Sequence, residues 1–246
     1  MPDNLSLASP PGCRVVAEEW PWPEPWPAAN FAALRYDTDT LCRADLADWH
    51  TALPRRLTTA ADKRRAEFLA GRLSARRAIQ ALTGVPATPG IDEERLPLWP
   101  ETLVGSITHS HGLAAATVAR RSHALGIGLD AERQLTPERA QRLAPQILVD
   151  AEREWMESLA DSERGKFVTL VFSLKESLFK ALYPLVRRRF HFPDACLTDW
   201  TPASGHVAIS LTTTLAPEWP AGARLDGQVT EIDDYLLTFI AIPPRS

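Results

Sequence analysis

The sequence predicts a mixed α/β fold, because two long helical patterns are interleaved with strand-like segments. The first helix is expected over residues 59–82. The second carries an apolar stripe with spacings of four and three, formed by Phe167, Val171, Leu174, Leu178 and Leu182. Strands are expected at residues 30–36, 103–108, 112–120, 124–132, 207–211, 228–231 and 235–242. Each half of the chain therefore offers several strands and one long helix.

Local signals indicate where helices begin and end. Thr83-Gly84 and the prolines that follow end the first long helix, and a short helix at residues 46–53 is expected to stop at Pro54. Thr136 is placed to cap a helix that opens with Pro137. Two further helices are expected to be capped by Asp150 and Ser162.

The composition describes a soluble globular protein with an adequate core. The chain has 246 residues, of which 45% are hydrophobic and 24% charged, enough for one large domain or two small ones. A formal net charge of −4 argues against general nucleic-acid binding, which needs a basic surface. No secretion signal and no apolar run of about eighteen residues is evident, so we expect no membrane span.

Two further features concern the compartment and the N-terminal region. Three widely spaced cysteines predict neither a disulfide framework nor a zinc site and favour the cytoplasm. Residues 20–27 alternate tryptophan with proline, which predicts an extended path. We expect this segment to pack across the first lobe through its indoles; the alternative is a docking segment for a partner or for lipid headgroups.

Carboxylates in two separated segments suggest a divalent cation site. Asp130 and Glu132 lie two residues apart in a predicted strand, so they share a face about 6.6 Å apart at Cα, while Leu129 and Ala131 face the core. Such a pair repels itself unless a cation compensates, and oxygen ligands suit Mg²⁺ or Mn²⁺. Alone, the pattern is weak.

The second long helix adds a carboxylate and a lysine on one face. Phe172, Glu176 and Lys180 follow one another at i, i+4 and i+8, opposite the apolar stripe. The simpler interpretation is an ordinary Glu–Lys helix pair. On the first helix Arg65, Arg72 and Arg76 form a positive stripe, either a solvated basic face or a grip on phosphates.

Taken in order, three motifs resemble those of the 4′-phosphopantetheinyl transferases. The motifs are Gly105-Ser106-Ile107-Thr108-His109-Ser110, Gly128-Leu129-Asp130-Ala131-Glu132 and Phe172-Ser173-Leu174-Lys175-Glu176-Ser177-Leu178-Phe179-Lys180. The resemblance covers roughly residues 60–190 and is to the long, surfactin-type kind. Residues 67–72 and 105–109 look most like the branch that includes enterobactin synthase component D.

This resemblance implies a fold and a reaction. The fold would be two similar α/β lobes related by a pseudo-twofold axis, with a cofactor cleft between them. Residues 1–121 would bind the phosphates of coenzyme A, and residues 122–246 would carry the metal and the catalytic helix. The reaction would move the 4′-phosphopantetheine arm of coenzyme A to a serine of an apo acyl or peptidyl carrier protein and release 3′,5′-ADP. The branch favours siderophore or other non-ribosomal peptide synthesis, and the length suggests a monomer.

The resemblance also implies roles for individual residues. Asp130, Glu132 and Glu176 would hold Mg²⁺ or Mn²⁺, Glu176 would accept the serine proton, and Lys180 would stabilise the transferring phosphate. The implied cofactor-binding residues are Arg65, Arg72, Arg76, Thr108, His109 and Lys175, with His109 just past a strand end and the Thr108 hydroxyl nearby.

Several alternatives stay open at this level. The family's last motif usually opens with Trp, whereas this chain has Phe172, which lacks the indole donor. Residues 190–192, behind the basic run 187–189, could dock an acidic carrier or form a solvated loop that enters a strand. A Mg²⁺-dependent phosphohydrolase would use the same carboxylates and cations, and a carrier-binding scaffold without transfer is a further candidate.

Overall fold

The structure is a computed structural model that describes residues 9–244 and forms two compact units. The first unit comprises Met1–Trp20 and Pro27–Arg120, and the second comprises Pro21–Trp26 and Arg121–Ser246. The division after Arg120 lies one residue from the boundary proposed from the sequence. The assignment of the short segment Pro21–Trp26 to the second unit is not evident from the sequence.

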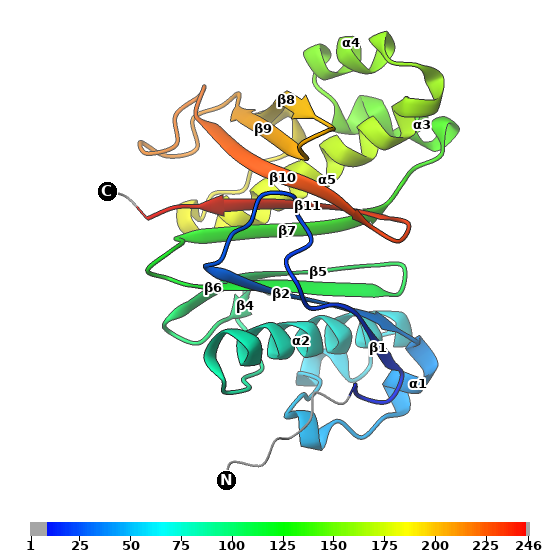
Figure 1. Cartoon of the computed structure of the whole chain (residues 1–246), viewed down its shortest axis with the longest axis vertical. Coiled ribbons are helices and arrows are strands. Elements are labelled where there is room, and N and C mark those ends of the chain that lie inside the picture. Colours follow the sequence, from blue (N-terminus) through cyan, green and yellow to red (C-terminus); the bar gives the residue numbers. More distant parts are fainter. Residues whose placement is uncertain (1–8, 245–246) are drawn as a thin grey trace. The chain divides into compact units, whose positions relative to one another are not determined.

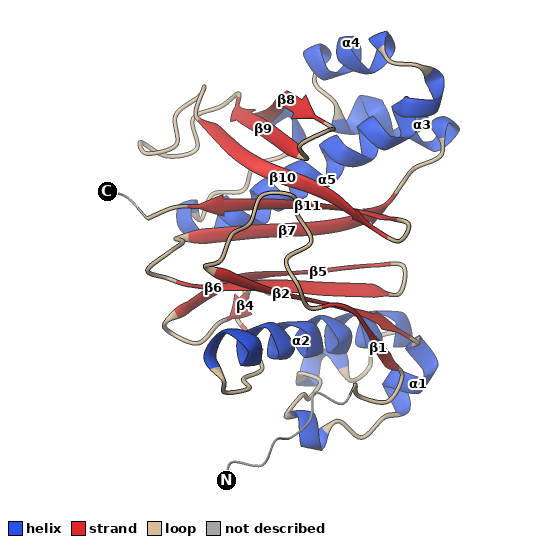
Figure 2. Cartoon of the chain, viewed as in Figure 1, coloured by secondary structure: helices blue, strands red, loops and turns tan. Residues whose placement is uncertain are grey.

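The first unit combines a four-stranded antiparallel sheet with one long helix (Figures 1 and 2). In sheet order the strands are β1 (Cys13–Ala17), β2 (Ala29–Tyr36), β6 (Leu113–Arg120) and β5 (Leu103–Ser110). Helix α2 (Asp62–Thr83) packs on β2, β5 and β6. The remaining elements of the first unit are α1 (Thr38–Arg43), η1 (Ala47–Trp49), η2 (Arg55–Leu57), β3 (Gly90–Ile91) and β4 (Pro97–Leu98).

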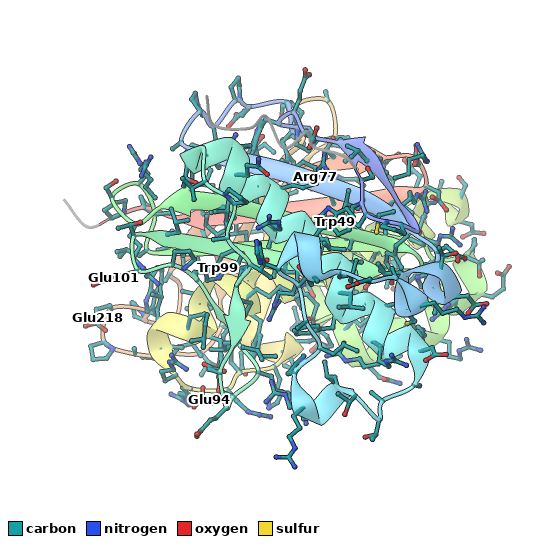
Figure 3. All side chains as sticks on the ribbon, turned by 90° about the horizontal axis from the view of Figure 1, so that it is seen from below. Trp49, Arg77, Glu94, Trp99, Glu101 and Glu218 are labelled. Carbon is teal, nitrogen blue, oxygen red and sulfur yellow. The ribbon has the colours of Figure 1, made fainter. Side chains whose placement is uncertain are left out.

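Helix α2 lies against two apolar clusters of the first unit. Trp49 packs against the cluster around Leu41 and Leu69, and Trp99 packs against the cluster around Ile79 and Leu103; both tryptophans are labelled in Figure 3. The helix ends as expected, because Gly84 has a φ of 77° and its N–H donates to the carbonyl of Gln80.

The second unit combines a five-stranded antiparallel sheet with three helices (Figure 1). In sheet order the strands are β7 (Gly126–Arg133), β11 (Tyr235–Ile242), β10 (Arg224–Ile232), β9 (His206–Leu211) and β8 (Ala195–Thr201). The other elements are α3 (Pro137–Ile147), α4 (Asp150–Ser158), α5 (Asp161–Val186) and η3 (Phe192–Asp194). Helix α5 packs mainly on β7, β11 and α3.

Both units share one order of connection. In each unit one strand precedes the long helix, and the last strand of the unit pairs with that strand. In the first unit β6 pairs with β2, which precedes α2, and in the second unit β11 pairs with β7, which precedes α5. This common topology agrees with the predicted mixed α/β class and with two similar halves. The pseudo-twofold relation between them stays a prediction.

The sequence-based helix assignments are mostly confirmed. The stripe residues from Phe167 to Leu182 are all buried, and the Thr136 side chain accepts from the N–H of Arg139 at the start of α3. Helix α4 begins at Asp150, but its cap is Val149, whose N–H donates to Glu152 at 2.9 Å. The predicted cap at Ser162 is wrong, because α5 begins at Asp161 after Ala160.

Two expectations for the N-terminal third are also wrong. The predicted helix at residues 46–53 is only the short turn η1, and an unpredicted helix, α1, precedes it. The tryptophan-proline segment was expected on the first lobe, but residues 21–26 belong to the second unit, where Trp22 and Trp26 lie 5.2 Å and 5.3 Å from the ring of Phe239. Gln228 anchors this segment, because its side chain accepts from the N–H of Glu24 and donates to the Glu24 carbonyl.

Within residues 9–244, no helix combines the length and apolar character that crossing a bilayer requires. Cys13, Cys42 and Cys196 are free thiols. Burial raises the pKa of Cys13 to about 12, so this thiol stays protonated at neutral pH.

Candidate active site

Helix α5 approaches strand β7 closely because the strand has glycines where they meet. A Cβ atom at Gly128 would lie 1.7 Å from the carbonyl oxygen of Ser177, and one at Gly126 would lie 2.4 Å from the carbonyl oxygen of Ala181. Neither position can hold a side chain without moving the helix. Since side chains alternate along a strand, Asp130 and Glu132 share this helix-facing side of β7 with the two glycines.

Hydrogen bonds hold the same contact in one register. The Thr238 hydroxyl of β11 lies 2.8 Å from the hydroxyls of both Ser173 and Ser177, one turn apart on α5. Thr238 pairs directly with Asp130 in the sheet. All three hydroxyl residues are buried, so the bonds are shielded from water. The sheet position of Asp130 is thereby tied to the helix segment that carries Glu176.

Asp130 and Lys180 form an ion pair across this contact. The Lys180 ammonium donates to Asp130 Oδ1 at 2.7 Å and to the carbonyl oxygen of Leu129 at 2.9 Å. The Asp130 residue is only 4% exposed, whereas the Lys180 side chain is 27% exposed. A buried carboxylate thus meets an ammonium that still reaches the surface.

Glu176 completes a group of three charges. Its pKa is raised by burial, against the opposing effect of Lys180, and the negative charge of Asp130 raises it further. Glu176 therefore lies within electrostatic reach of Asp130. Phe172, Glu176 and Lys180 are each partly buried, so the face that they share is only half exposed.

The carboxylates of Asp130 and Glu176 fit the predicted metal site in part. Two neighbouring carboxylates, one with its pKa raised by burial and by the other, suit a hard cation that would relieve their repulsion. Across residues 9–244, however, no three His, Cys, Asp or Glu side chains are arranged so that they could hold a metal ion. Glu132 is partly buried and lies two residues after Asp130 on β7. It therefore does not form a preformed three-ligand site with Asp130 and Glu176.

A cavity adjoins Glu176 on the same unit. It has a volume of about 270 Å³ and is lined by Glu176, Arg189 and the rings of Phe179, Phe190 and Phe192, among others. Phe172 lies beside this wall, with its ring 5.5 Å from that of Phe192. The phenylalanine that replaces the usual tryptophan thus contributes apolar packing at the edge of the cavity.

Lys175 occupies a different environment from the one expected. It is 3% exposed, and its ammonium donates to Glu152 Oε2 at 2.7 Å and to the carbonyl oxygen of Ile147 at 2.9 Å. Burial lowers the pKa of Lys175, and the Glu152 carboxylate acts against that shift. The other Glu152 oxygen accepts from the N–H of Leu197. This arrangement joins α3, α4, α5 and β8, whereas the predicted cofactor contact of Lys175 would need an accessible ammonium.

In the first unit, His109 lies beside two charged side chains of α2. Its Nδ1 is 3.9 Å from Glu67 Oε2, and its Nε2 is 3.3 Å from a guanidinium nitrogen of Arg64. His109 is inside β5, one residue before its end, and not past it. Thr108 is buried, and the alternation of β5 directs its side chain to the face opposite His109.

The predicted arginine stripe is not one surface. Arg72 is 5% exposed, donates to the carbonyl oxygen of Gly90 at 2.9 Å and stacks 4.6 Å from the Phe68 ring centroid. Burial, with a smaller effect of Arg56, lowers its pKa to about 10. Arg65 pairs with Asp62 at 2.9 Å, and partly buried Arg76 also has its pKa lowered by burial. Only Arg65 and Arg76 keep partial exposure.

Sequence reasoning missed three residues of these sites. Arg64 and Glu67 are spaced i, i+3 on α2 and therefore share a face, which is the available signal. Glu152, the buried partner of Lys175, offers no comparable signal, because its partner is distant in sequence and its burial depends on the tertiary fold.

Comparisons with known proteins agree with the motifs. Residues 53–119 match the 4′-phosphopantetheinyl transferase N-terminal domain, and residues 126–240 match the 4′-phosphopantetheinyl transferase superfamily. Enterobactin synthase component D of Salmonella typhimurium is 37% identical over 198 residues, which is 79% of each chain. The 4′-phosphopantetheinyl transferase Npt of Nocardia iowensis is 32% identical over 78% of this chain and 88% of that protein.

Two further likenesses are shorter or more distant. Enterobactin synthase component D of Salmonella typhi is 36% identical over 162 residues, and the match spans 65% of the length of each protein. Among solved structures, Thermotoga maritima holo-[acyl-carrier-protein] synthase has a TM-score of 0.38 and 21% identity over 50% of this chain and 65% of that chain, too distant to add to the assignment. With its motifs in order and relatives aligned over most of its length, the chain belongs to the 4′-phosphopantetheinyl transferase superfamily.

Proposed function

We propose that this chain transfers the 4′-phosphopantetheine arm of coenzyme A to a serine of an acyl or peptidyl carrier protein. The observation that carries the proposal is the group formed by Asp130, Glu176 and Lys180, in which a carboxyl with a raised pKa lies beside an ammonium and a second carboxylate. Such a group supplies both a proton acceptor and charge stabilisation, the two requirements of phosphoryl transfer to a hydroxyl. The enterobactin relatives favour a carrier in siderophore synthesis.

In the proposed reaction the serine oxygen bonds to the phosphorus that bears the pantetheine arm, and the bond from that phosphorus to 3′,5′-ADP breaks. Glu176 accepts the serine proton, and 3′,5′-ADP leaves with the electron pair. Lys180 stabilises negative charge on the transferring phosphate. Its partly exposed ammonium is suited to this role, whereas the ammonium of Lys175 is buried in an ion pair.

Asp130 and Glu176, with Glu132 as the third predicted ligand, would hold Mg²⁺ or Mn²⁺, which when bound neutralises charge on the acids and on the pyrophosphate. In the first unit, partly exposed His109 is the best candidate for a phosphate contact, and Arg65 and Arg76 are further candidates. Each of these three side chains is accessible to some extent, which a phosphate contact requires.

The test measures the mass of a carrier protein. The chain is incubated with coenzyme A, Mg²⁺ and an apo-carrier, and the carrier is weighed by mass spectrometry. A gain equal to phosphopantetheine supports the transferase. An unchanged carrier with cleaved coenzyme A would identify a phosphohydrolase, and no change in either would leave a carrier-binding scaffold. Glu176→Gln should reduce transfer by roughly 10²–10⁴-fold, the usual contribution of a general base.

For the carrier contact we propose the exposed arginines 187–189 at the end of α5. Arg189 and Glu176 line the same cavity, so these cations lie near the proposed chemistry. Phe190, which the sequence suggested as part of an apolar docking patch, is buried and packs 5.2 Å from the Phe179 ring. Charge attraction to an acidic carrier therefore carries this proposal.

Charge reversal separates carrier binding from cofactor binding. Arg188→Glu/Arg189→Glu should raise the KM for the carrier and leave that for coenzyme A unchanged. The matched control reverses two other exposed arginines, Arg120 and Arg121. If the Arg188→Glu/Arg189→Glu variant and the control had the same KM for the carrier, the docking proposal would be contradicted. We further propose that the chain acts as a monomer in the cytoplasm, where its free thiols stay reduced.

A further inference from the structure

The carboxylate of Glu67 lies near two side chains of the first unit, Arg64 and His109. Glu67 Oε2 is 3.4 Å from a guanidinium nitrogen of Arg64 and 3.9 Å from Nδ1 of His109. The exposed fractions of the three side chains are 52% for Arg64, 32% for His109 and 14% for Glu67. Of the three side chains Glu67 is therefore the least exposed, and Arg64 and His109 are the more accessible ones.

The contact between Arg64 and His109 defines the state of the imidazole. A guanidinium has five N–H donors and no acceptor, so in the 3.3 Å contact the Nε2 atom of His109 must accept. The imidazole is then neutral, and its proton is on Nδ1, the nitrogen that faces Glu67. Nε2 can donate to a phosphate oxygen only after the ring gains a second proton and Arg64 turns away.

We infer that Glu67 is a positioning residue that orients His109 and Arg64 toward one anion and stabilises the imidazolium formed when that anion binds. The inference rests on the proposed function, in which His109 contacts a phosphate of coenzyme A. The anion draws Arg64 away from Nε2, the ring takes one proton from solvent, and Nε2–H donates to the phosphate. Glu67 remains against Nδ1–H and offsets the new positive charge. Binding of coenzyme A is therefore coupled to proton uptake.

The test uses 3′,5′-ADP as the probe and isothermal titration calorimetry in buffers of different ionisation enthalpy. The variant Glu67→Gln keeps the shape of the side chain and removes its charge. The control Glu18→Gln breaks another pair between a carboxylate and an arginine of α2, in which Arg77 (labelled in Figure 3) donates to Glu18 at 2.7 Å. Circular dichroism checks that each variant is folded.

Wild type and Glu18→Gln should bind 3′,5′-ADP with uptake of a proton above neutral pH. Glu67→Gln should bind 3′,5′-ADP roughly tenfold more weakly, as expected for loss of a charge-assisted contact. The number of protons taken up per bound 3′,5′-ADP should also be smaller than in wild type. The KM of Glu67→Gln for coenzyme A should rise with little change in kcat. Glu67→Asp, which restores the charge on a shorter stem, should recover part of the affinity and of the proton uptake.

Equal affinity and equal proton uptake in wild type and Glu67→Gln would overturn the inference, as would binding by wild type without any proton uptake. If Glu67→Gln does not fold, the test falls to Glu67→Asp. A folded Glu67→Asp variant that binds 3′,5′-ADP without taking up a proton would also overturn the inference. A wild-type protein that binds neither 3′,5′-ADP nor coenzyme A would contradict the proposed function itself, which separates the two failures.

Discussion

Lys180 of α5 donates to Asp130 of β7 at 2.7 Å, across a helix–strand contact that glycine makes close enough for this bond. The pair connects the two motifs that the sequence places fifty residues apart. It also fixes the position of Glu176, one turn before Lys180, relative to Asp130. The proposed chemistry of the second unit depends on this contact.

Removal of Lys180 should destabilise the protein as well as inactivate it. Lys180→Met leaves the Asp130 carboxylate buried without its ammonium, and we expect a loss of about 3 kcal/mol in the free energy of unfolding. Lys166→Met on the same helix breaks the more exposed pair with Glu231 and should cost less than about 1 kcal/mol. Urea denaturation of the two variants measures the difference. Equal stability would show that the Asp130–Lys180 pair is not buried in solution.

The raised pKa of Glu176 predicts a cost in stability at neutral pH. Because the folded state holds this proton more tightly than the unfolded chain, the carboxyl contributes stability below its ordinary pKa of 4.5, and this contribution is lost as the pH rises through the raised value. In metal-free buffer Glu176→Gln should therefore have a higher Tm than wild type near neutral pH. The difference should vanish well below pH 4.5. A lower Tm of the variant at neutral pH would contradict the assigned environment.

The buried pair of Lys175 and Glu152 should be a structural ion pair. Lys175→Met and Glu152→Gln each leave one buried charge unpaired, and each should lower the free energy of unfolding by about 3–5 kcal/mol. The double variant should lose much less than the sum, because no charge is then left unpaired. A double-mutant cycle measured by denaturation tests this. Additive losses would mean that the two side chains do not interact.

The close contact at Gly128 predicts a large effect of one methyl group. Gly128→Ala places a Cβ in the position of the Ser177 carbonyl, so α5 must move and Glu176 must move with it. We expect a destabilised protein with strongly reduced carrier labelling. Gly90→Ala is the control, because its Cβ would meet Leu98 at an ordinary 3.5 Å. If Gly128→Ala retained full activity and Tm, the helix–strand contact could not be as close as described.

The parts of the fold that follow local rules were predictable from the sequence. Periodicity located α2, α5 and most strands, and motif order singled out Asp130 and Lys180, which form an ion pair in the second unit. Strand alternation also placed Asp130 and Glu132 on one face, since it depends only on the pleat.

The parts that depend on distant partners were not predictable. Lys175 follows the motif pattern, but its burial is decided by Glu152, which the tertiary fold brings to it. Arg72 looks like a surface cation by spacing, yet it lies under Phe68 and bonds the Gly90 carbonyl. The packing of Trp22 on Phe239 is likewise set by a strand more than two hundred residues away.

The central claim is that acids from β7 and α5 share one divalent ion during transfer. The most direct measurement is anomalous diffraction from crystals of the protein grown with coenzyme A and Mn²⁺. The account predicts one strong peak about 2.1 Å from carboxylate oxygens of both Asp130 and Glu176, the distance typical of such small cations. A peak elsewhere, or none, in crystals of protein that modifies a carrier in the presence of Mn²⁺ would contradict it.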